Sequence, residues 1–401
     1  MSTLKVDAIR HNSATSDAIT TAADGTCTAK LTSIGGGQLS NRNLVMNGSH
    51  IISQRGNTFA GHSSGDKYCS DRWNFYIASA GTFNYYTRLN NAGDKPADQG
   101  FQYAIKADCD TASSSLAAGA AHILITKWEG QDIQHIKKGT SNAEKLTLSF
   151  WVKSSKTGTH IAELIDEDNT RKCSQAYTIS STGTWEKKII TFPADTTGAF
   201  TNDNNKSMSL FFWLAAGSNY TSGSLNTTWS ATADANRAVG QVNISNTTND
   251  YWYMTGCQLE VGDTATSFEH ISYGDDLRRC QRYFYGHSGA NINGSNSSTP
   301  DTVLNTGSCQ AGHSVSVAIN LPVPMRDVPT LYSTVTGSTR YRINSAGANT
   351  NSGSDPVIWT AGCSHTTVIM DIAGFSGLVN NAACTVRRYQ GSGVLGFSAE
   401  I

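Results

Sequence analysis

Two carboxylates beside a tryptophan are the best-placed residues in this chain for acid–base chemistry. Glu129 and Asp132 lie three residues apart in the segment KWEGQDI, next to Trp128. Hydrolysis of a glycosidic bond needs two carboxyl groups about 5 to 9 Å apart, one of them kept protonated by its surroundings. Glu129 and Asp132 are therefore the better of two acidic candidates for hydrolysis.

The other acidic candidate is the run Asp166–Asp168 in IDEDNT. This is a turn sequence, and adjacent acids in a tight turn are expected to be solvated and to share similar pKa values. The phosphate-binding pattern GxxxxGK[ST] and the zinc pattern HExxH are both absent from the sequence. We therefore expect a protein that is not an enzyme.

Aromatic rings on the outer face of strands support a different chemistry, the binding of a sugar. The C–H face of a sugar packs on a ring, while its hydroxyls bind amide and hydroxyl partners. Trp151 is the clearest candidate, because in LTLSFWVKSS it shares one phase with Thr147, Ser149 and Lys153. The further candidates are Tyr85, Tyr86, Trp213, Trp229 and Trp252. Each ring could instead belong to the core or to a subunit interface.

Composition disfavours a polyanionic partner for the chain as a whole. Charged residues make up 15% of 401 residues and the formal net charge is -1, against about 25% charged residues in an average soluble domain. A surface made polar by hydroxyl and amide groups offers no global field for nucleic acid or anionic lipid. We expect no nucleic-acid partner.

Neither a signal peptide nor a membrane span is expected. The opening segment MSTLKVDAIR has no apolar stretch, and the longest strongly apolar run, Leu210–Ala216, is too short to cross a bilayer. We therefore expect synthesis in a cytosol and no membrane insertion. Nine cysteines without a CxxC pair favour reduced, mostly buried thiols over disulfides or a zinc site. No cofactor is expected.

The elements that position these residues are strands. In LTLSFWVKSS the residues Leu146, Leu148, Phe150 and Val152 share the inner phase, and MSLFFWLAAG and YWYMTGCQLEVG are apolar in both phases, as in central strands. Residues 41–270 are therefore predicted to form an all-β sandwich of jelly-roll type. The alternation in HSVSVAINLPVPM predicts a smaller β domain over residues 287–401.

A connector helix is predicted between the two β domains, over residues 271–286. Asp275 and Asp276 suit the positive end of a helix that runs from Asp275 to Tyr285. An apolar stripe and three arginines toward the negative end complete the predicted connector: Leu277, Cys280, Phe284, Arg278, Arg279 and Arg282. The alternative is a solvated charged linker.

Residues 1–40 read as a separate arm. AITTAADGTCTAKL predicts two short strands around an Asp24-Gly25 turn, and Gly35–Gly37 predicts a flexible joint. An arm with only small apolar side chains cannot bury enough surface to fold alone. Three copies packed about one axis would bury it, so we expect a homotrimer.

Three ordered motifs resemble a known family. NLVMNG, ISQRG and DRW (Asn43–Gly48, Ile52–Gly56, Asp71–Trp73) are similar to the opening of the carbohydrate-binding-module-like jelly roll in tail fibres and receptor-binding proteins of tailed bacteriophages. QLEVGDTATSFEHISYGDDLRRCQRYF, residues 258–284, resembles the end of that jelly roll and its connector. LPVPMRDVPTL and FSAEI resemble the family's C-terminal domain, and STLKVDAI resembles N-terminal arms of structural proteins from phages of aquatic bacteria.

The resemblance implies an adhesin of the virion, placed in the tail. Its N-terminal arm would join other tail proteins, and its distal β domains would bind host surface polysaccharide without cleaving it. Arg55, Arg72 and Glu269 lie in the matching motifs and are interpreted as framework residues. A purely structural virion protein, such as a head fibre or tail adaptor, and a glycan depolymerase are the alternatives. A structural calcium ion would suit the fold, but no EF-type loop specifies one.

Overall fold

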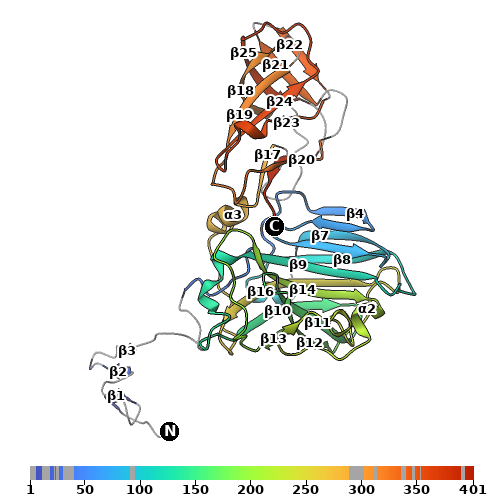
Figure 1. Cartoon of the computed structure of the whole chain (residues 1–401), viewed down its shortest axis with the longest axis vertical. Coiled ribbons are helices and arrows are strands. Elements are labelled where there is room, and N and C mark those ends of the chain that lie inside the picture. The colour runs from blue at the N-terminus through green and yellow to red at the C-terminus, as the bar shows by residue number, and fades with distance from the viewer. Residues whose placement is uncertain are drawn as a thin grey trace.

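The computed structural model describes residues 6–10, 19–21, 23, 27–29, 40–90, 95–288, 302–310, 314–335, 340–345, 348–352, 354–389 and 393–401. The protein is all-β, as predicted from the sequence. Figure 1 shows a large β-sandwich and a second β module stacked along the long axis, with residue 401 at their junction.

Two antiparallel sheets form the large sandwich, here called the first sandwich. One has six strands in the order β13-β10-β16-β8-β7-β4 and the other seven in the order β15-β12-β11-β14-β9-β6-β5. The strands of the six-stranded sheet are β4 Thr58–His62, β7 Thr82–Asn90, β8 Tyr103–Thr111, β10 Leu146–Ser154, β13 Glu186–Phe192 and β16 Tyr251–Val261. Those of the seven-stranded sheet are β5 Gly65–Tyr68, β6 Asn74–Ala78, β9 Ala121–Glu129, β11 Gly158–Asp166, β12 Arg171–Ile179, β14 Lys206–Ala216 and β15 Ser230–Ala231.

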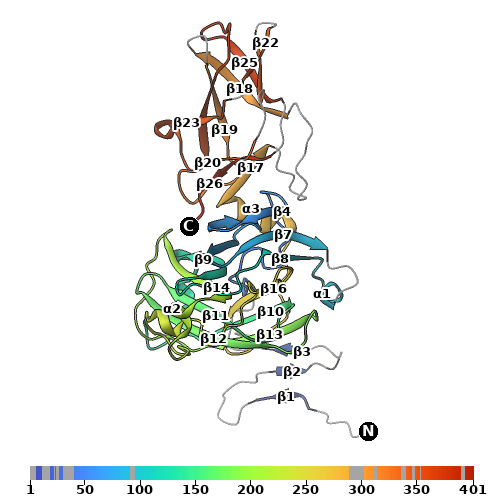
Figure 2. The same cartoon turned by 90° about the vertical axis from the view of Figure 1, so that its right-hand side faces the viewer.

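The core of the first sandwich lies between these sheets. Leu148, Phe150 and Val152 of β10 are fully buried, as their alternation predicts, and they pack with residues such as Phe212 and Trp252. Figure 2 shows the two sheets side by side, with β4 nearest the second module and β13 at the opposite end. The outer face of the seven-stranded sheet carries a smaller apolar cluster, which includes Ala238 from the long segment after β14.

The second module is built on two further antiparallel sheets. A three-stranded sheet has the order β17-β26-β20, and a seven-stranded sheet has the order β22-β21-β25-β18-β19-β24-β23. Their bounds are β17 Phe284–Ser288, β18 Thr302–Gln310, β19 Ser314–Asn320, β20 Thr330–Ser333, β21 Tyr341–Ser345, β22 Ala348–Ser352, β23 Val357–Ile358, β24 Thr367–Ala373, β25 Ala383–Arg388 and β26 Leu395–Ser398. Val315, Val317 and Ile319 are buried in a core separate from that of the first sandwich.

The connector helix is real but shorter than predicted. Helix α3 spans Tyr273–Gln281, and the Ser272 hydroxyl accepts a hydrogen bond from the Asp275 amide at 3.2 Å, capping its N-terminus. The prediction that the helix reaches Tyr285 is wrong, because Phe284 starts strand β17 and pairs with Ser398 of β26. Backbone hydrogen bonds to β26 replace those that another helical turn would have made.

The connector side chains have different surroundings. Cys280 and Phe284 are buried and Leu277 is half-buried, so the predicted stripe packs only in part along a helix. Arg278 is exposed and pairs with Asp275 at 3.0 Å, and Arg279 donates to the Asn41 side chain at 3.1 Å. Arg282 binds Glu129 of the first sandwich in a bidentate pair at 2.7 and 2.8 Å. The helix is therefore docked by polar contacts more than by its apolar stripe.

The arm contains three short strands. β1 Ala8–Ile9, β2 Ile19–Thr21 and β3 Cys27–Ala29 form one antiparallel sheet, and the pairing of β2 with β3 agrees with the predicted hairpin. The Asp24-Gly25 turn and the Gly35–Gly37 joint lie outside the described residues. The expected trimer is not addressed by a single chain and stays a prediction.

Helices are short throughout the described residues. Besides α3 they are α1 Lys95–Asp98, α2 Ser218–Thr221 and the 3-10 turns Gly130–Asp132, Gln134–Ile136, Asp234–Asn236 and Thr360–Gly362. Within this part of the chain, no helix has the length and apolar character to span a membrane. Seven of its eight free cysteines are buried and Cys363 is partly exposed, which agrees with the predicted thiols.

Candidate functional site: an aromatic face on the six-stranded sheet

Strand alternation places a set of long side chains on the outer face of the six-stranded sheet. Tyr85 and Trp252 point into the core and are fully buried. Their strand neighbours Tyr86, Tyr251 and Tyr253 therefore point outward, where all three are half-buried. The outer face thus carries aromatic rings that the sandwich core does not use.

Cross-strand register lines up these side chains in one row. Lys153 of β10 lies opposite Tyr253 of β16, Tyr253 opposite Lys106 of β8, and Lys106 opposite Tyr86 of β7. Trp185, immediately before β13, continues the line beyond Lys153, but its ring is buried and packs against the row without offering a face to a ligand. We call Tyr86, Lys106, Tyr253, Lys153 and Trp185 the aromatic row; it crosses the strands in the order shown in Figure 2.

Lysines alternate with rings along the aromatic row and contact them. The Lys153 ammonium lies 5.0 Å from the Trp185 ring centroid and 4.7 Å from that of Tyr253. The Lys106 ammonium lies 5.3 Å from the Tyr253 ring centroid and 5.4 Å from that of Tyr86. These distances are typical of cation–π contacts, in which an ammonium is attracted to the face of an aromatic ring.

Electrostatics keep Lys106 charged at its place in the row. Burial alone would lower the pKa of Lys106. Its 2.8 Å hydrogen bond to Asp108 and its attraction to Asp108 and Tyr253 together outweigh burial and hold the pKa above its ordinary value. Burial raises the pKa of Tyr253, against the opposing effect of the Lys106 ammonium. At neutral pH the row therefore presents Lys106 as an ammonium group and Tyr253 as a neutral phenol.

A pocket of about 190 Å³ adjoins the row at Trp151. Trp151 lies opposite Lys187 of β13 and Thr255 of β16, on the same outer face. The lining residues are Gln99, Phe101, Ser149, Trp151, Lys187, Gly256, Ser267, Phe268 and His270. The pocket thus combines aromatic walls with polar groups.

A β-bulge shapes this pocket. The pairing of β10 with β16 shifts register between Ser149 and Trp151, and Gly256 sits at the bulge with φ of +61°. A Cβ atom on Gly256 would lie 2.7 Å from the Phe101 ring, so only glycine lets that ring pack here. Phe101 in turn contacts Phe268 and His270, with ring centroids 4.9 and 5.5 Å away.

Rings, hydroxyls and ammonium groups of this kind can bind a carbohydrate. Half-buried aromatic faces offer apolar contact to sugar C–H groups, and the neighbouring polar side chains offer hydrogen bonds. The row and the Trp151 pocket together form an extended surface, which suits a chain of sugar units better than a single small molecule. We call this surface the aromatic face.

The candidates predicted from sequence separate into two groups. Trp151 and Tyr86 lie on the aromatic face and are half-buried. Tyr85, Trp213 and Trp252 are fully buried, so their proposed sugar contacts are corrected here, because a buried ring offers no face to a ligand. Trp229 is half-buried elsewhere, packs against the core and donates to the Pro193 carbonyl at 2.8 Å.

Trp213 shows why an outward phase is insufficient evidence. It belongs to the cluster on the outer face of the seven-stranded sheet, which the segment after β14 covers. Its indole donates to Glu163 at 3.1 Å, and Glu163 also binds Arg237 at 2.9 Å. Long-range packing therefore converts this ring into part of a second core.

Tyr251, Tyr253 and Lys106 were not among the residues predicted from the sequence. Trp252 is the largest ring in the segment YWYMTG, and choosing it as a sugar contact assigned the inward-facing residues of this strand to the outer face. The two flanking tyrosines were the available signal, because residues on either side of a buried one share the opposite face. Their pairing with Lys106 depends on register and is not visible in the sequence.

The carboxylate pair Glu129 and Asp132 is not arranged for hydrolysis. Glu129 is fully buried, and its oxygens accept hydrogen bonds from Arg282, Tyr283 and Gln131. Burial would raise the pKa of Glu129, but the bonds from Arg282 and Tyr283 outweigh it and hold the pKa below its usual value. The side chain of Asp132 borders an open cavity of about 450 Å³, and partial burial of its carboxyl group raises its pKa. Because Glu129 is buried and bound by Arg282 and Tyr283, it cannot reach a substrate in that cavity.

The second acidic group also differs from its prediction. Asp166 is fully buried at the end of β11 and binds the Lys138 ammonium at 2.5 Å, so it is not the solvated turn residue expected. Lys138 also binds Asp195 at 3.0 Å, which Arg171 holds at 2.8 Å. Protein cations thus neutralise these carboxylates. Across the described ranges, no group of three or more histidine, cysteine, aspartate or glutamate side chains is arranged to hold a metal.

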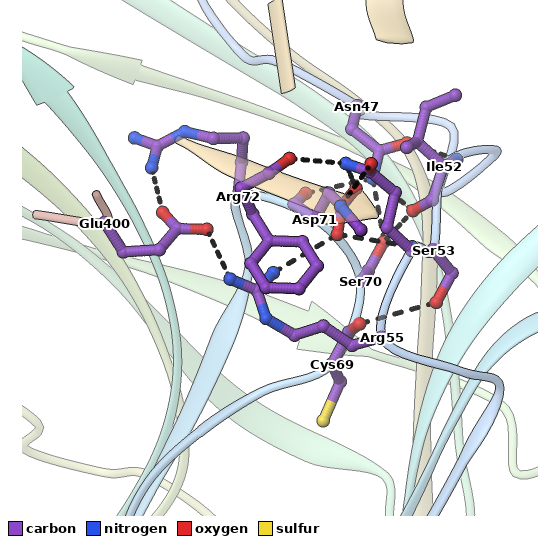
Figure 3. A network of polar contacts seen from close by, with 12 residues as sticks. Asn47, Ile52, Ser53, Arg55, Cys69, Ser70, Asp71, Arg72 and Glu400 are labelled. Carbon is purple, nitrogen blue, oxygen red and sulfur yellow. Dashed lines mark hydrogen bonds and ion pairs between the residues drawn. The ribbon is translucent and has the colours of Figure 1, made fainter. Parts of the chain in front are cut away.

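The motif arginines form a buried network at the junction between the first sandwich and the second module. Figure 3 shows Glu400 bridging the guanidinium groups of Arg72 and Arg55. Arg55 also binds Asp71 at 3.2 Å. Glu269 accepts a hydrogen bond from the Asn43 amide at 2.9 Å. All of these contacts lie within the chain, consistent with framework roles for Arg55, Arg72 and Glu269.

No protein-family model matches the sequence, and no curated protein matches it. Among solved structures, the enzymatically active domain of tailspike protein 4 from bacteriophage CBA120 matches 55% of this chain and 21% of its own, with 11% identity and a TM-score of 0.27.

Two sugar-binding proteins give matches of similar quality. TmCBM61, solved with β-1,4-galactotriose, matches 55% of this chain and 99% of its own, with 11% identity and a TM-score of 0.26. A putative sugar binding protein from Bacteroides thetaiotaomicron matches 55% and 100%, with 11% identity and a TM-score of 0.28. Identities and TM-scores this low establish neither a shared fold nor a shared function.

Proposed function

We propose that this chain is a non-catalytic glycan-binding adhesin of a bacteriophage virion. The observation that carries glycan binding is the aromatic face, where half-buried tyrosines and Trp151 alternate with polar and charged side chains in one register. The proposed place in the virion tail rests on the sequence motifs that resemble phage tail fibres. The proposed trimer and the attachment through residues 1–40 rest on the composition of the arm.

Absence of cleavage is part of the proposal. In the pair Glu129 and Asp132, Glu129 is buried and accepts hydrogen bonds from Arg282 and Tyr283. The aromatic face itself carries Asp108, which Lys106 neutralises. These contacts support binding without hydrolysis. Incubation with a bound polysaccharide should release no new reducing ends.

Binding to a panel of bacterial surface polysaccharides and to host cells tests the proposal. Tyr253→Ala and Trp151→Ala should each weaken binding roughly two- to tenfold, because a stacked ring contributes on the order of 0.5–1.5 kcal/mol. Trp359→Ala is the matched control, since Trp359 is 56% exposed in the second module, away from the aromatic face.

Three outcomes separate the candidate functions. Loss of binding in both aromatic-face variants, with the control unchanged, supports the adhesin. A chain that binds no glycan and no host cell, yet is found in virions, would identify a purely structural part. Release of soluble oligosaccharide would identify a depolymerase.

A further inference from the structure

We propose that the Trp151 pocket accepts an acidic sugar unit, one whose ring carries a carboxylate as in a hexuronic acid. This inference rests on the proposed glycan binding and goes beyond it by naming the chemical class of the ligand. The argument concerns local charge, since the chain as a whole is nearly neutral.

The pocket lining contains cationic and neutral groups but no carboxylate. Its polar members are Gln99, Ser149, Lys187, Ser267 and His270. A lysine ammonium provides three hydrogen-bond donors and no acceptor. A neutral sugar presents many hydroxyl donors that carboxylate acceptors bind well, whereas an acidic sugar presents strong acceptors. The lining therefore complements the acidic sugar better.

Lys187 is placed to meet such a carboxylate. It is exposed and lies directly opposite Trp151 across β10 and β13. Directly opposite residues in antiparallel strands have Cβ atoms about 4.5–5.5 Å apart. A sugar ring stacked on the Trp151 indole would thus bring a carboxylate at its edge within reach of the Lys187 ammonium.

Nearby carboxylates are bound within the chain and do not neutralise Lys187. Glu260 is buried and accepts hydrogen bonds from the Thr266 amide at 2.9 Å and from the Gln258 side chain at 2.9 Å. Glu269 is bound to the Asn43 amide. In the part of the chain that the structure describes, Lys187 makes no ion pair, whereas its neighbour Lys188 pairs with Glu186 at 2.6 Å.

Matched ligands test the inference on the full-length chain. The probes are an oligomer of a hexuronic acid and the same oligomer with its carboxyl groups reduced to alcohols. We expect the acidic oligomer to bind about tenfold more tightly, as a charge-assisted hydrogen bond at a half-exposed site allows. We also expect its binding, and not that of the reduced oligomer, to weaken as salt rises.

Matched variants locate the effect. Lys187→Gln should lower affinity for the acidic oligomer to that of the reduced one, and Lys187→Arg should retain most of it. Lys137→Gln is the control, because Lys137 is an exposed lysine distant in sequence that pairs with Glu144 at 2.7 Å. Circular dichroism of each variant checks that the fold is intact.

The results distinguish the inference from the proposed function. Equal binding of both oligomers, lost in Trp151→Ala, would overturn the acidic preference and leave glycan binding standing. Preference for the acidic oligomer that survives Lys187→Gln would overturn the assignment to this pocket. Binding of neither these oligomers nor any surface polysaccharide would overturn the proposed function itself.

Discussion

Replacing Glu400 with glutamine should loosen the junction between the first sandwich and the second module. The Glu400 carboxylate binds Arg55 at 3.2 Å and also binds Arg72, and the three side chains are 2–6% exposed. Glutamine keeps the shape of glutamate but removes the charge. Of the two buried guanidinium groups, only that of Arg55 would then keep a carboxylate, that of Asp71.

The size of the loss in unfolding free energy follows from the partners that each arginine keeps. Arg55 keeps Asp71 and the Phe284 ring, 3.6 Å from its guanidinium carbon. Arg72 keeps only the Lys127 carbonyl, at 2.7 Å, and the Tyr283 ring, at 3.4 Å, so its buried charge loses its carboxylate. Breaking a buried ion pair by removing one partner costs about 3–5 kcal/mol. Because glutamine still accepts a hydrogen bond, we expect about 3 kcal/mol.

Urea unfolding and limited proteolysis of the segment 271–286 measure this loss. Asp275→Asn is the control, since it breaks an exposed pair with Arg278 in the same segment and should cost less than about 0.5 kcal/mol. Glu400→Gln should lower the unfolding midpoint and open the segment to protease. If Glu400→Gln and Asp275→Asn give the same unfolding midpoint and the same cleavage of this segment, the buried network does not hold the junction and the reasoning is wrong.

Three further predictions concern other parts of the chain. Gly256→Ala should lower the melting temperature and weaken glycan binding, because its Cβ would collide with the Phe101 ring in the Trp151 pocket; unchanged binding would refute the role of the bulge. Burial raises the pKa of Asp71 to about 6, so the native state binds its proton more tightly than the unfolded chain does. The unfolding free energy of the wild type relative to Asp71→Asn should therefore fall as pH rises from about 4 to 6, and a flat difference would contradict the shift. Deleting residues 1–37 should leave a folded, glycan-binding monomer that no longer enters virions, as sedimentation and particle composition would report; incorporation at normal copy number would contradict the arm's role.

The sequence by itself determined the all-β class and much of the core. Period-two alternation in LTLSFWVKSS identified Leu148, Phe150 and Val152 as inner residues and Trp151 as an outer one, because strand geometry sends successive side chains to opposite faces. Asp275 and Asp276 marked the N-terminal end of α3 to within two residues, since acidic side chains interact locally with the positive end of a helix. Such features depend on neighbours in the chain and can be read from them.

Tertiary structure alone decided the rest of the site. The first four residues of YWYMTG are large and apolar or aromatic, so each could face either side of the sheet. Only the pairing of β16 with β8 and β10 places Tyr253 on the outer face, between Lys106 and Lys153. Tertiary packing also decided that the segment after β14 covers Trp213. It decided the end of α3 as well, because Phe284 pairs with β26 instead of continuing the helix. Arg72 and Glu400 meet across 328 residues. Such contacts form only when sheets pack, because their partners are set by register and burial, not by local sequence.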